Sequence, residues 1–212
     1  MSTQPPPGSM GMGALRSDLD LGRPLQALTE AGAAFVPLAL SEPFRARLQR
    51  EIEAGPFQRL PDQIGPVRQE ADLFIITGDM ADHPAVARLR AEFVARVHRD
   101  GSQLPGLAGW WPNEAYVQRY EPGALGVSPH VDSKRFAVLV AIFTTQGSAP
   151  LALCRTRAGE IIQEWEAGPG SLTLLRGPGL LDAEDARPFH SVRGPTAGRR
   201  FSITFRMNQQ PR

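Results

Sequence analysis

Apolar residues recur at helical spacing in two segments of the first half of the chain. The first segment, residues 41–55, opens with a serine suited to a helix N-cap and closes with a glycine, and its apolar positions lie four residues apart at Phe44, Leu48 and Ile52. The second, residues 83–98, places four apolar residues on one face, namely Val86, Leu89, Phe93 and Val97. Two amphipathic helices are therefore predicted, and the mixed pattern of residues 15–29 is compatible with a third, short helix.

After Asp100 the pattern changes to short runs of β-forming residues separated by Gly and Pro. Seven such runs can be read, at residues 115–120, 136–144, 151–154, 160–166, 171–175, 189–192 and 200–207. Strands at this spacing are typical of an all-β sandwich or barrel. A further strand at residues 34–38 precedes the helices. The predicted fold class is mainly β (α+β), a double-stranded β-helix or jelly roll with N-terminal supporting helices.

The remaining stretches are less regular. Residues 1–13 are rich in Pro, Gly and Ser and are expected to form a disordered tail, with residues 14–212 as a single domain. Residues 55–78 are punctuated by Pro56, Pro61, Gly65 and Pro66 and contain only one strand-like run, at 73–77. A long irregular stretch of this kind is predicted to be a functional lid or disordered.

The last predicted strand alternates strictly between apolar and polar side chains. Phe201, Ile203 and Phe205 lie on one face, and the opposite face carries Arg200, Ser202, Thr204 and Arg206. An edge strand with a solvated basic face would give this pattern. A strand whose polar face points into a barrel would give it too, and the histidine ten residues earlier favours this second interpretation.

Composition excludes several classes of protein. The 212 residues carry a net charge of +1, so nucleic acid could be bound only through a local patch. Cys154 is the only cysteine, which excludes an internal disulfide and indicates a small buried residue in a strand. No apolar run approaches the roughly 18 residues of a membrane-spanning helix, so no membrane contact and a cytoplasmic location are expected. Trp110 and Trp111 are predicted to be core residues.

The strongest chemical signal is the sequence His130-Val131-Asp132. A nitrogen ligand and a carboxylate one residue apart can hold one metal ion if a third ligand arrives from elsewhere in the fold. His190, on a later predicted strand, is the obvious third. Two histidines and one carboxylate on one face of a metal leave further positions open, the arrangement used by non-haem Fe(II) oxygenases.

With these residues in place, the sequence resembles a known family. The pattern Asn113-x4-Gln118-x-Tyr120-x2-Gly123, His130-x-Asp132, His190 and Arg200-x5-Arg206 resembles the iron(II)- and 2-oxoglutarate-dependent dioxygenases, most of all the AlkB-type branch. The resemblance covers about residues 110–208. It implies Fe(II), 2-oxoglutarate and O2 as cofactors, with iron bound by the two histidines and the aspartate.

The resemblance also implies a cosubstrate site. Arg200 would pair with the distal carboxylate of 2-oxoglutarate and Arg206 with the carboxylate beside the keto group, since the planar guanidinium suits carboxylates. Tyr120 would donate a hydrogen bond to the cosubstrate, and Gln118, where the family usually has Asn, would lie beside it. The neighbouring Arg199 is an alternative to Arg200 for the distal carboxylate.

The primary substrate is left open. AlkB-type enzymes remove N-methyl groups from alkylated nucleic acid bases by hydroxylating them, but their acidic base-reading residue is replaced here by Lys134. The candidate substrate residues are Lys134, Arg135 and Phe136. One alternative is hydroxylation of a small anionic metabolite or amino-acid-like substrate, with Lys134 or Arg135 neutralising its charge. Another is a non-catalytic, cupin-like binding module. Oligomeric state is not indicated.

Overall fold

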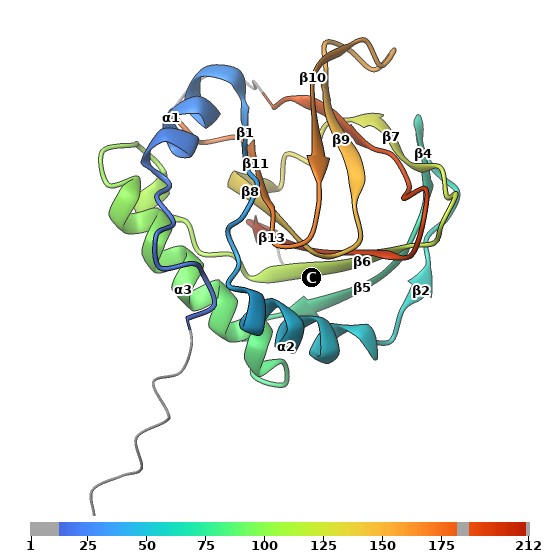
Figure 1. Ribbon diagram of the computed structural model, residues 1–212. Coiled ribbons are helices and arrows are strands. Elements are labelled where there is room, and N and C mark those ends of the chain that lie inside the picture. Colours follow the sequence, from blue (N-terminus) through green and yellow to red (C-terminus); the bar gives the residue numbers. More distant parts are fainter. Residues whose placement is uncertain (1–12, 182–186, 211–212) are drawn as a thin grey trace, which may run out of the picture.

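Two antiparallel sheets enclose the interior of the computed structural model, which describes residues 13–181 and 187–210 (Figure 1). In the described residues, the larger sheet has the order β1 (Ala33–Val36), β11 (Leu172–Arg176), β8 (Phe136–Gln146), β13 (Arg200–Asn208), β6 (Glu114–Tyr120), β5 (Asp72–Thr77) and β2 (Gln58–Arg59). The smaller has the order β10 (Ile161–Ala167), β9 (Ala149–Cys154), β12 (Phe189–Val192), β7 (Gly126–His130), β4 (Val67–Glu70) and β3 (Gln63–Ile64). The predicted double-stranded β-helix is confirmed. The predicted tail, apart from Gly13, lies outside the described residues.

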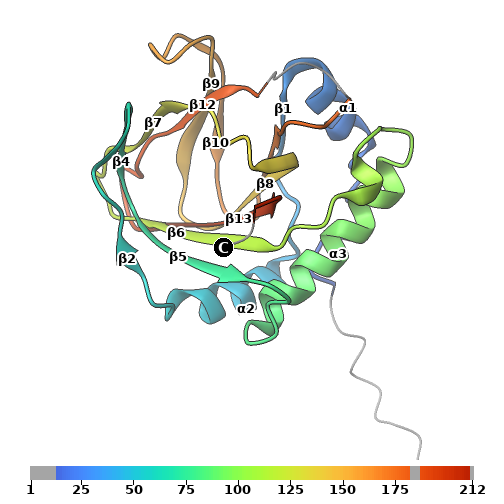
Figure 2. The same cartoon turned by 180° about the vertical axis from the view of Figure 1, so that it is seen from behind.

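Three α-helices cover the outer face of the larger sheet. They are α1 (Gly22–Ala31), α2 (Glu42–Glu53) and α3 (Pro84–Asp100), and a short 3-10 helix, η1 (Leu107–Gly109), follows them. Figures 1 and 2 show α2 and α3 against β5 and β6, on the side away from β9 and β10. The apolar positions predicted for α2 and α3 are all buried in one core with the sheet. Both helix predictions are confirmed, and the short helix predicted for residues 15–29 is found slightly later, as α1.

Strand β13 lies in the middle of the larger sheet, between β8 and β6. Phe201, Ile203 and Phe205 are fully buried, the last two within the core that the helices cover. Arg200, Ser202 and Thr204 are also buried, each only 1% exposed, so the polar face cannot be a solvated one. The edge-strand interpretation is therefore wrong, and this polar face points between the two sheets.

Residues 55–78 are more regular than the sequence indicated. They form β2, β3, β4 and β5, with the prolines and glycines at the turns between them. Gln69 of β4 pairs with Val127 of β7, and such pairing with distant strands is invisible to a local pattern. The prediction of an irregular stretch is wrong here. Strand β7 was not predicted at all, since Gly126 and Pro129 weaken any strand pattern.

The two adjacent tryptophans have different environments. Trp110 is fully buried, its indole N–H donates to the carbonyl of Leu139 at 2.9 Å, and its ring contacts Phe93 edge to face. Trp111 is 50% exposed and lies beneath the guanidinium of Arg90, so its prediction as a core residue is wrong. Cys154 is buried in β9, as predicted. No helix in the described part of the chain is long and apolar enough to span a membrane.

Candidate metal centre

His130 and His190 lie directly opposite each other on the antiparallel strands β7 and β12. Their ring centroids are 4.3 Å apart, and Asp132 follows in the loop after β7, with its Oδ2 3.8 Å from His190 Nε2. One ligand atom from each of the three residues lies within 4.8 Å of the others. The fold thus brings together the three residues that the sequence singled out, two from β7 and the loop after it and one from the distant strand β12.

Backbone carbonyls orient both imidazoles. His130 Nδ1–H donates to the carbonyl of Ser128 at 2.9 Å, and His190 Nδ1–H donates to the carbonyl of Pro188 at 3.2 Å. Because a carbonyl can only accept, Nδ1 carries the proton, and the lone pair of each neutral ring is on Nε2. This second layer of hydrogen bonds is what commonly fixes the tautomer of metal-binding histidines.

The electrostatics of the cluster favour a neutral His190 beside an ionised Asp132. Burial, and then the proximity of His130, lower the pKa of His190 to about 4. Burial by itself would raise the pKa of Asp132, but the positive charge of Arg206, with smaller contributions from the histidines, holds that pKa below its usual value. At neutral pH His190 therefore presents a nitrogen lone pair beside the ionised carboxylate of Asp132.

The two oxygens of Asp132 have different roles. Oδ1 accepts a hydrogen bond from Arg206 Nη2 at 3.0 Å. Oδ2 is buried and has no hydrogen-bond partner in the described structure. A buried, ionised oxygen without a partner is costly, so it calls for a cation at that position. Together with two Nε2 lone pairs, this oxygen fits a divalent transition metal held by two histidines and one carboxylate.

Arg200 is a buried cation in the same interior. It is 1% exposed, its Nη2 donates to Thr144 Oγ1 at 3.0 Å, and its guanidinium lies 5.5 Å from the ring of Tyr120, its cross-strand partner. No carboxylate of the described residues forms an ion pair with it, its Nε has no partner, and burial lowers its pKa. A desolvated guanidinium in this state is a site for an anion. Arg199 instead pairs with Glu121 at the surface, 2.9 Å away.

Arg206 differs from Arg200 because it already has a partner. Besides its hydrogen bond to Asp132, its guanidinium packs 4.2 Å from the ring centroid of Tyr116 and 4.6 Å from that of Phe136. Its Nε remains without a hydrogen bond. The arginine therefore fixes the metal-ligating carboxylate and keeps one N–H available toward the interior.

A cavity of about 220 Å³ lies against His130, His190 and Arg206, whereas Asp132 and Arg200 are not among its described lining residues. Its polar walls come from the two histidines, Arg206 and five further described residues, namely Gln69, Tyr116, Gln118, Tyr120 and Thr204. The side chain of Gln118 makes no hydrogen bond within the described structure. The apolar walls include Leu60, Ile64 and Leu73, which the sequence did not single out. The only signal for them was the unusual stretch 55–78 as a whole, because three separate aliphatic residues carry no chemical motif.

The residues predicted to bind substrate are placed differently. Lys134 is exposed and Arg135 is half-buried, with its Nη2 donating to the hydroxyl of Tyr116 at 3.3 Å. Phe136 is 4% exposed and packs between Tyr116 and Arg206. None of the three is among the described residues that line the cavity. Phe136 supports the guanidinium of Arg206 and does not present a stacking face to the cavity.

No protein-family model and no curated protein sequence matches the chain. Among solved structures, it is similar to a Pseudomonas putida prolyl-4-hydroxylase, with a TM-score of 0.60 and 16% identity over 89% of this chain and 99% of that one. It is also similar to a prolyl hydroxylase from Trichoplax adhaerens in complex with a fragment of the hypoxia-inducible factor oxygen degradation domain. The TM-score is 0.60, with 16% identity over 88% of both chains. A 2OG-Fe(II) oxygenase family oxidoreductase from Burkholderia pseudomallei is similar with a TM-score of 0.59 and 13% identity over 90% of this chain and 91% of that one. The chain thus has the double-stranded β-helix fold found in these oxygenase structures.

Proposed function

We propose that the chain is an Fe(II)- and 2-oxoglutarate-dependent dioxygenase that hydroxylates a substrate C–H bond. The observation that carries the proposal is the unpartnered Oδ2 of Asp132, aimed at the space that His130 and His190 also face. This oxygen lies in the same interior as Arg200, a buried cation without an ion-pair partner among the described residues. A metal donor set beside a buried anion site is what a metal-bound dicarboxylate requires.

Several polar groups of the interior have a role in this proposal. Nε2 of the two histidines and Oδ2 of Asp132 would hold iron, which would supply activation of O2 at the expense of 2-oxoglutarate, giving succinate and CO2. Arg200, with Thr144 and Tyr120 beside it, receives the distal carboxylate. Arg206 faces the carboxylate next to the keto group. The free amide of Gln118 hydrogen-bonds the cosubstrate on the same wall.

The protein's contribution is to position charges and to exclude water. Arg200 and Tyr120 are almost completely buried, and Arg206 is held by Asp132 and two aromatic rings. Rigid donors in a water-poor interior interact with a carboxylate more strongly than the same groups in solvent. The cosubstrate is thus held in one orientation, and the substrate C–H has to approach through the remaining part of the cavity.

The fold neighbours support an oxygenase, since two of those described are prolyl hydroxylases. The finer alternatives concern the substrate. The sequence motif supports oxidative N-demethylation of alkylated bases as in AlkB-type enzymes, whereas hydroxylation of a small anionic metabolite needs a free cation in the cavity. Arg206, the arginine among the described lining residues, bonds Asp132 and is assigned to a carboxylate of the cosubstrate, which leaves no further lining cation for an anionic metabolite.

Succinate formation tests the function. Purified protein supplied with Fe(II), 2-oxoglutarate and O2 is expected to release succinate slowly even without a substrate, and the Asp132→Ala variant is expected to lose this activity. The control is His83→Ala, a histidine at the N-terminus of α3. Binding of 2-oxoglutarate without any succinate would indicate a cupin-like binding module, and activity retained in Asp132→Ala would contradict the ligand assignment.

A further inference from the structure

The cavity has a second set of walls that the cosubstrate does not require. Besides the polar groups, it is lined by six aliphatic side chains, contributed by both sheets and by the segment before β3: Leu60, Ile64, Leu73, Val127, Ile142 and Val192. Ile64 is 55% exposed although it lines a cavity, because it lies at the tip of the β3–β4 hairpin. A large aliphatic side chain displayed at this position offers contact area to whatever enters the cavity.

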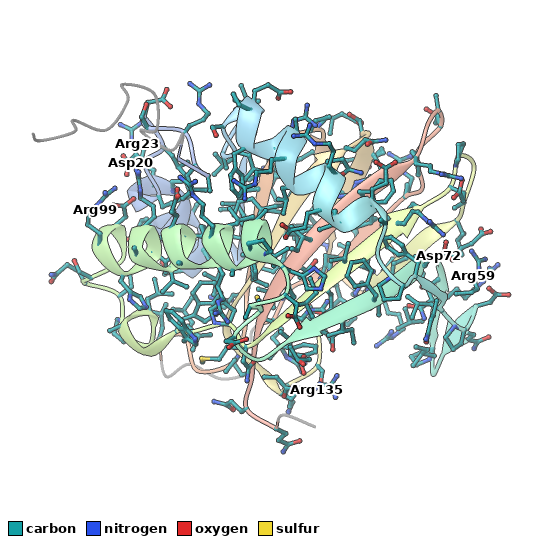
Figure 3. The ribbon with its side chains drawn as sticks, turned by 90° about the horizontal axis from the view of Figure 1, so that it is seen from below. Asp20, Arg23, Arg59, Asp72, Arg99 and Arg135 are labelled. Carbon is teal, nitrogen blue, oxygen red and sulfur yellow. The ribbon has the colours of Figure 1, made fainter. Side chains whose placement is uncertain are left out.

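Several charged side chains around these walls are already paired. Among the described lining residues, Arg206 is the one Lys, Arg, Asp or Glu. It is bonded to Asp132. On the adjoining strands, Arg119 pairs with Asp72 at 2.6 Å and Arg59 pairs with Glu70 at 3.2 Å. Figure 3 shows Arg59 and Asp72 at one end of the molecule and Arg135 well away from them. Because Arg206 serves Asp132 and a carboxylate of the cosubstrate, an ammonium, carboxylate or phosphate of the substrate itself would lose water without gaining a further partner among the described lining residues, so an uncharged substrate group is favoured.

The walls also disfavour a flipped base. A flipped base needs an accessible aromatic or apolar surface on which to stack. The two tyrosines of the cavity are 8% and 2% exposed, and the rings of Tyr116 and Tyr120 are already in contact with Arg206 and Arg200. The volume of about 220 Å³ must in addition hold the cosubstrate. This is below the roughly 300 Å³ at which drug-sized pockets begin, so only a small substrate group can enter.

Two neutral features beside the aliphatic walls suit a peptide backbone. Gln69 donates from Nε2 to the carbonyl of Pro61 at 3.0 Å, and its side chain lines the cavity. Strand β3, which carries Ile64, forms an edge of the smaller sheet in the described structure, so one side of its backbone has no strand partner. A free sheet edge pairs readily with an extended chain.

We infer that the substrate group is an uncharged aliphatic side chain flanked by amides, as in a polypeptide, and that Ile64 determines this specificity together with Leu60 and Leu73. The inference rests on the proposed function and names its substrate class. The aliphatic side chain lies among these three residues, its flanking amides lie along β3 and Gln69, and the C–H to be hydroxylated faces the metal-binding histidines.

Binding can be measured without turnover. Full-length protein is titrated with N-acetyl-leucine methylamide, with a leucine-containing hexapeptide, with free leucine and with a 1-methyladenine oligonucleotide, and amide shifts are followed by NMR. The two amide-flanked probes are expected to shift the amides of Ile64, Gln69 and Val127. Ile64→Asp is expected to weaken their binding about tenfold or more, because a carboxylate replaces an aliphatic contact, whereas Ile64→Val retains binding.

The matched control is Ile162→Asp, since Ile162 is 53% exposed on β10, at the opposite edge of the smaller sheet. This variant is expected to bind the probes as the unaltered protein does. Tighter binding of free leucine or of the methylated oligonucleotide would overturn the inference, as would equal weakening by the two Asp variants. Succinate release without substrate is measured separately. If it occurs while the peptide probes fail to bind, the substrate class is wrong and the proposed function stands.

Discussion

Arg206 binds only one of the two carboxylate oxygens of Asp132. Its Nη2 donates to Oδ1 at 3.0 Å, and Oδ2 is buried without a hydrogen-bond partner in the described structure. The ion pair fixes the orientation of the carboxylate before a metal arrives. The rings of Tyr116 and Phe136 pack against Arg206 and immobilise its guanidinium, which therefore holds the carboxylate in one position.

Arg206→Met is expected to weaken metal binding. Loss of an outer partner of a metal ligand typically lowers affinity by about 10–100-fold, because the ligand is no longer oriented. The measurement is an anaerobic titration with Fe(II), or with Mn(II) as a stable substitute. Arg199→Met serves as the control, because Arg199 is exposed and pairs with Glu121. Equal affinity in the two variants would show that the Asp132 contact does not orient the ligand.

Arg200→Gln is expected to raise the dissociation constant of 2-oxoglutarate by about 100-fold or more, since removal of one partner from a buried charged pair costs about 2–5 kcal/mol. Calorimetry on the metal-loaded protein measures it. Arg199→Gln is expected to bind 2-oxoglutarate normally. If Arg199→Gln, and not Arg200→Gln, lost binding, the carboxylate site would lie at the surface and not between the sheets.

Ser128 connects the β3–β4 hairpin to the strand that carries His130. Its hydroxyl accepts a hydrogen bond from the backbone N–H of Arg68 at 2.9 Å, while its carbonyl holds His130. Ser128→Ala removes only the first bond, worth about 1 kcal/mol. Hydrogen exchange is expected to become about fivefold faster at Arg68 and its neighbours in β4, with the core strands unaffected. Unchanged exchange in β4 would mean that the ladder with β7 alone holds the hairpin.

Much of the fold could be predicted because its elements carry strong local patterns. The apolar face of α3 and the alternation in β13 each specify which side is buried. The alternation alone left open whether the face of Arg200 meets solvent, and only the nearby His190 favoured the interior, since the answer depends on β13 lying between β6 and β8. The two-residue strands β2 and β3 exist only through their partners, and therefore the aliphatic walls at Leu60 and Ile64 could not be identified in advance.

The candidate metal site was the most predictable part of the chemistry. His130 and Asp132 form a short motif, and His190 follows on a strand of the right type. The split use of the two oxygens of Asp132 could not be read from sequence, because it depends on a guanidinium from a strand far along the chain. The exposed position of Trp111 was equally unpredictable, since it adjoins a fully buried tryptophan.

The most direct test of the account is a crystal structure of the protein grown anaerobically with Fe(II) and 2-oxoglutarate, with anomalous data collected at the iron edge. One anomalous peak is expected, bonded to Nε2 of His130, Nε2 of His190 and Oδ2 of Asp132, with a carboxylate of the cosubstrate against Arg200. A peak bonded to other residues, or a cosubstrate distant from Arg200, would contradict it.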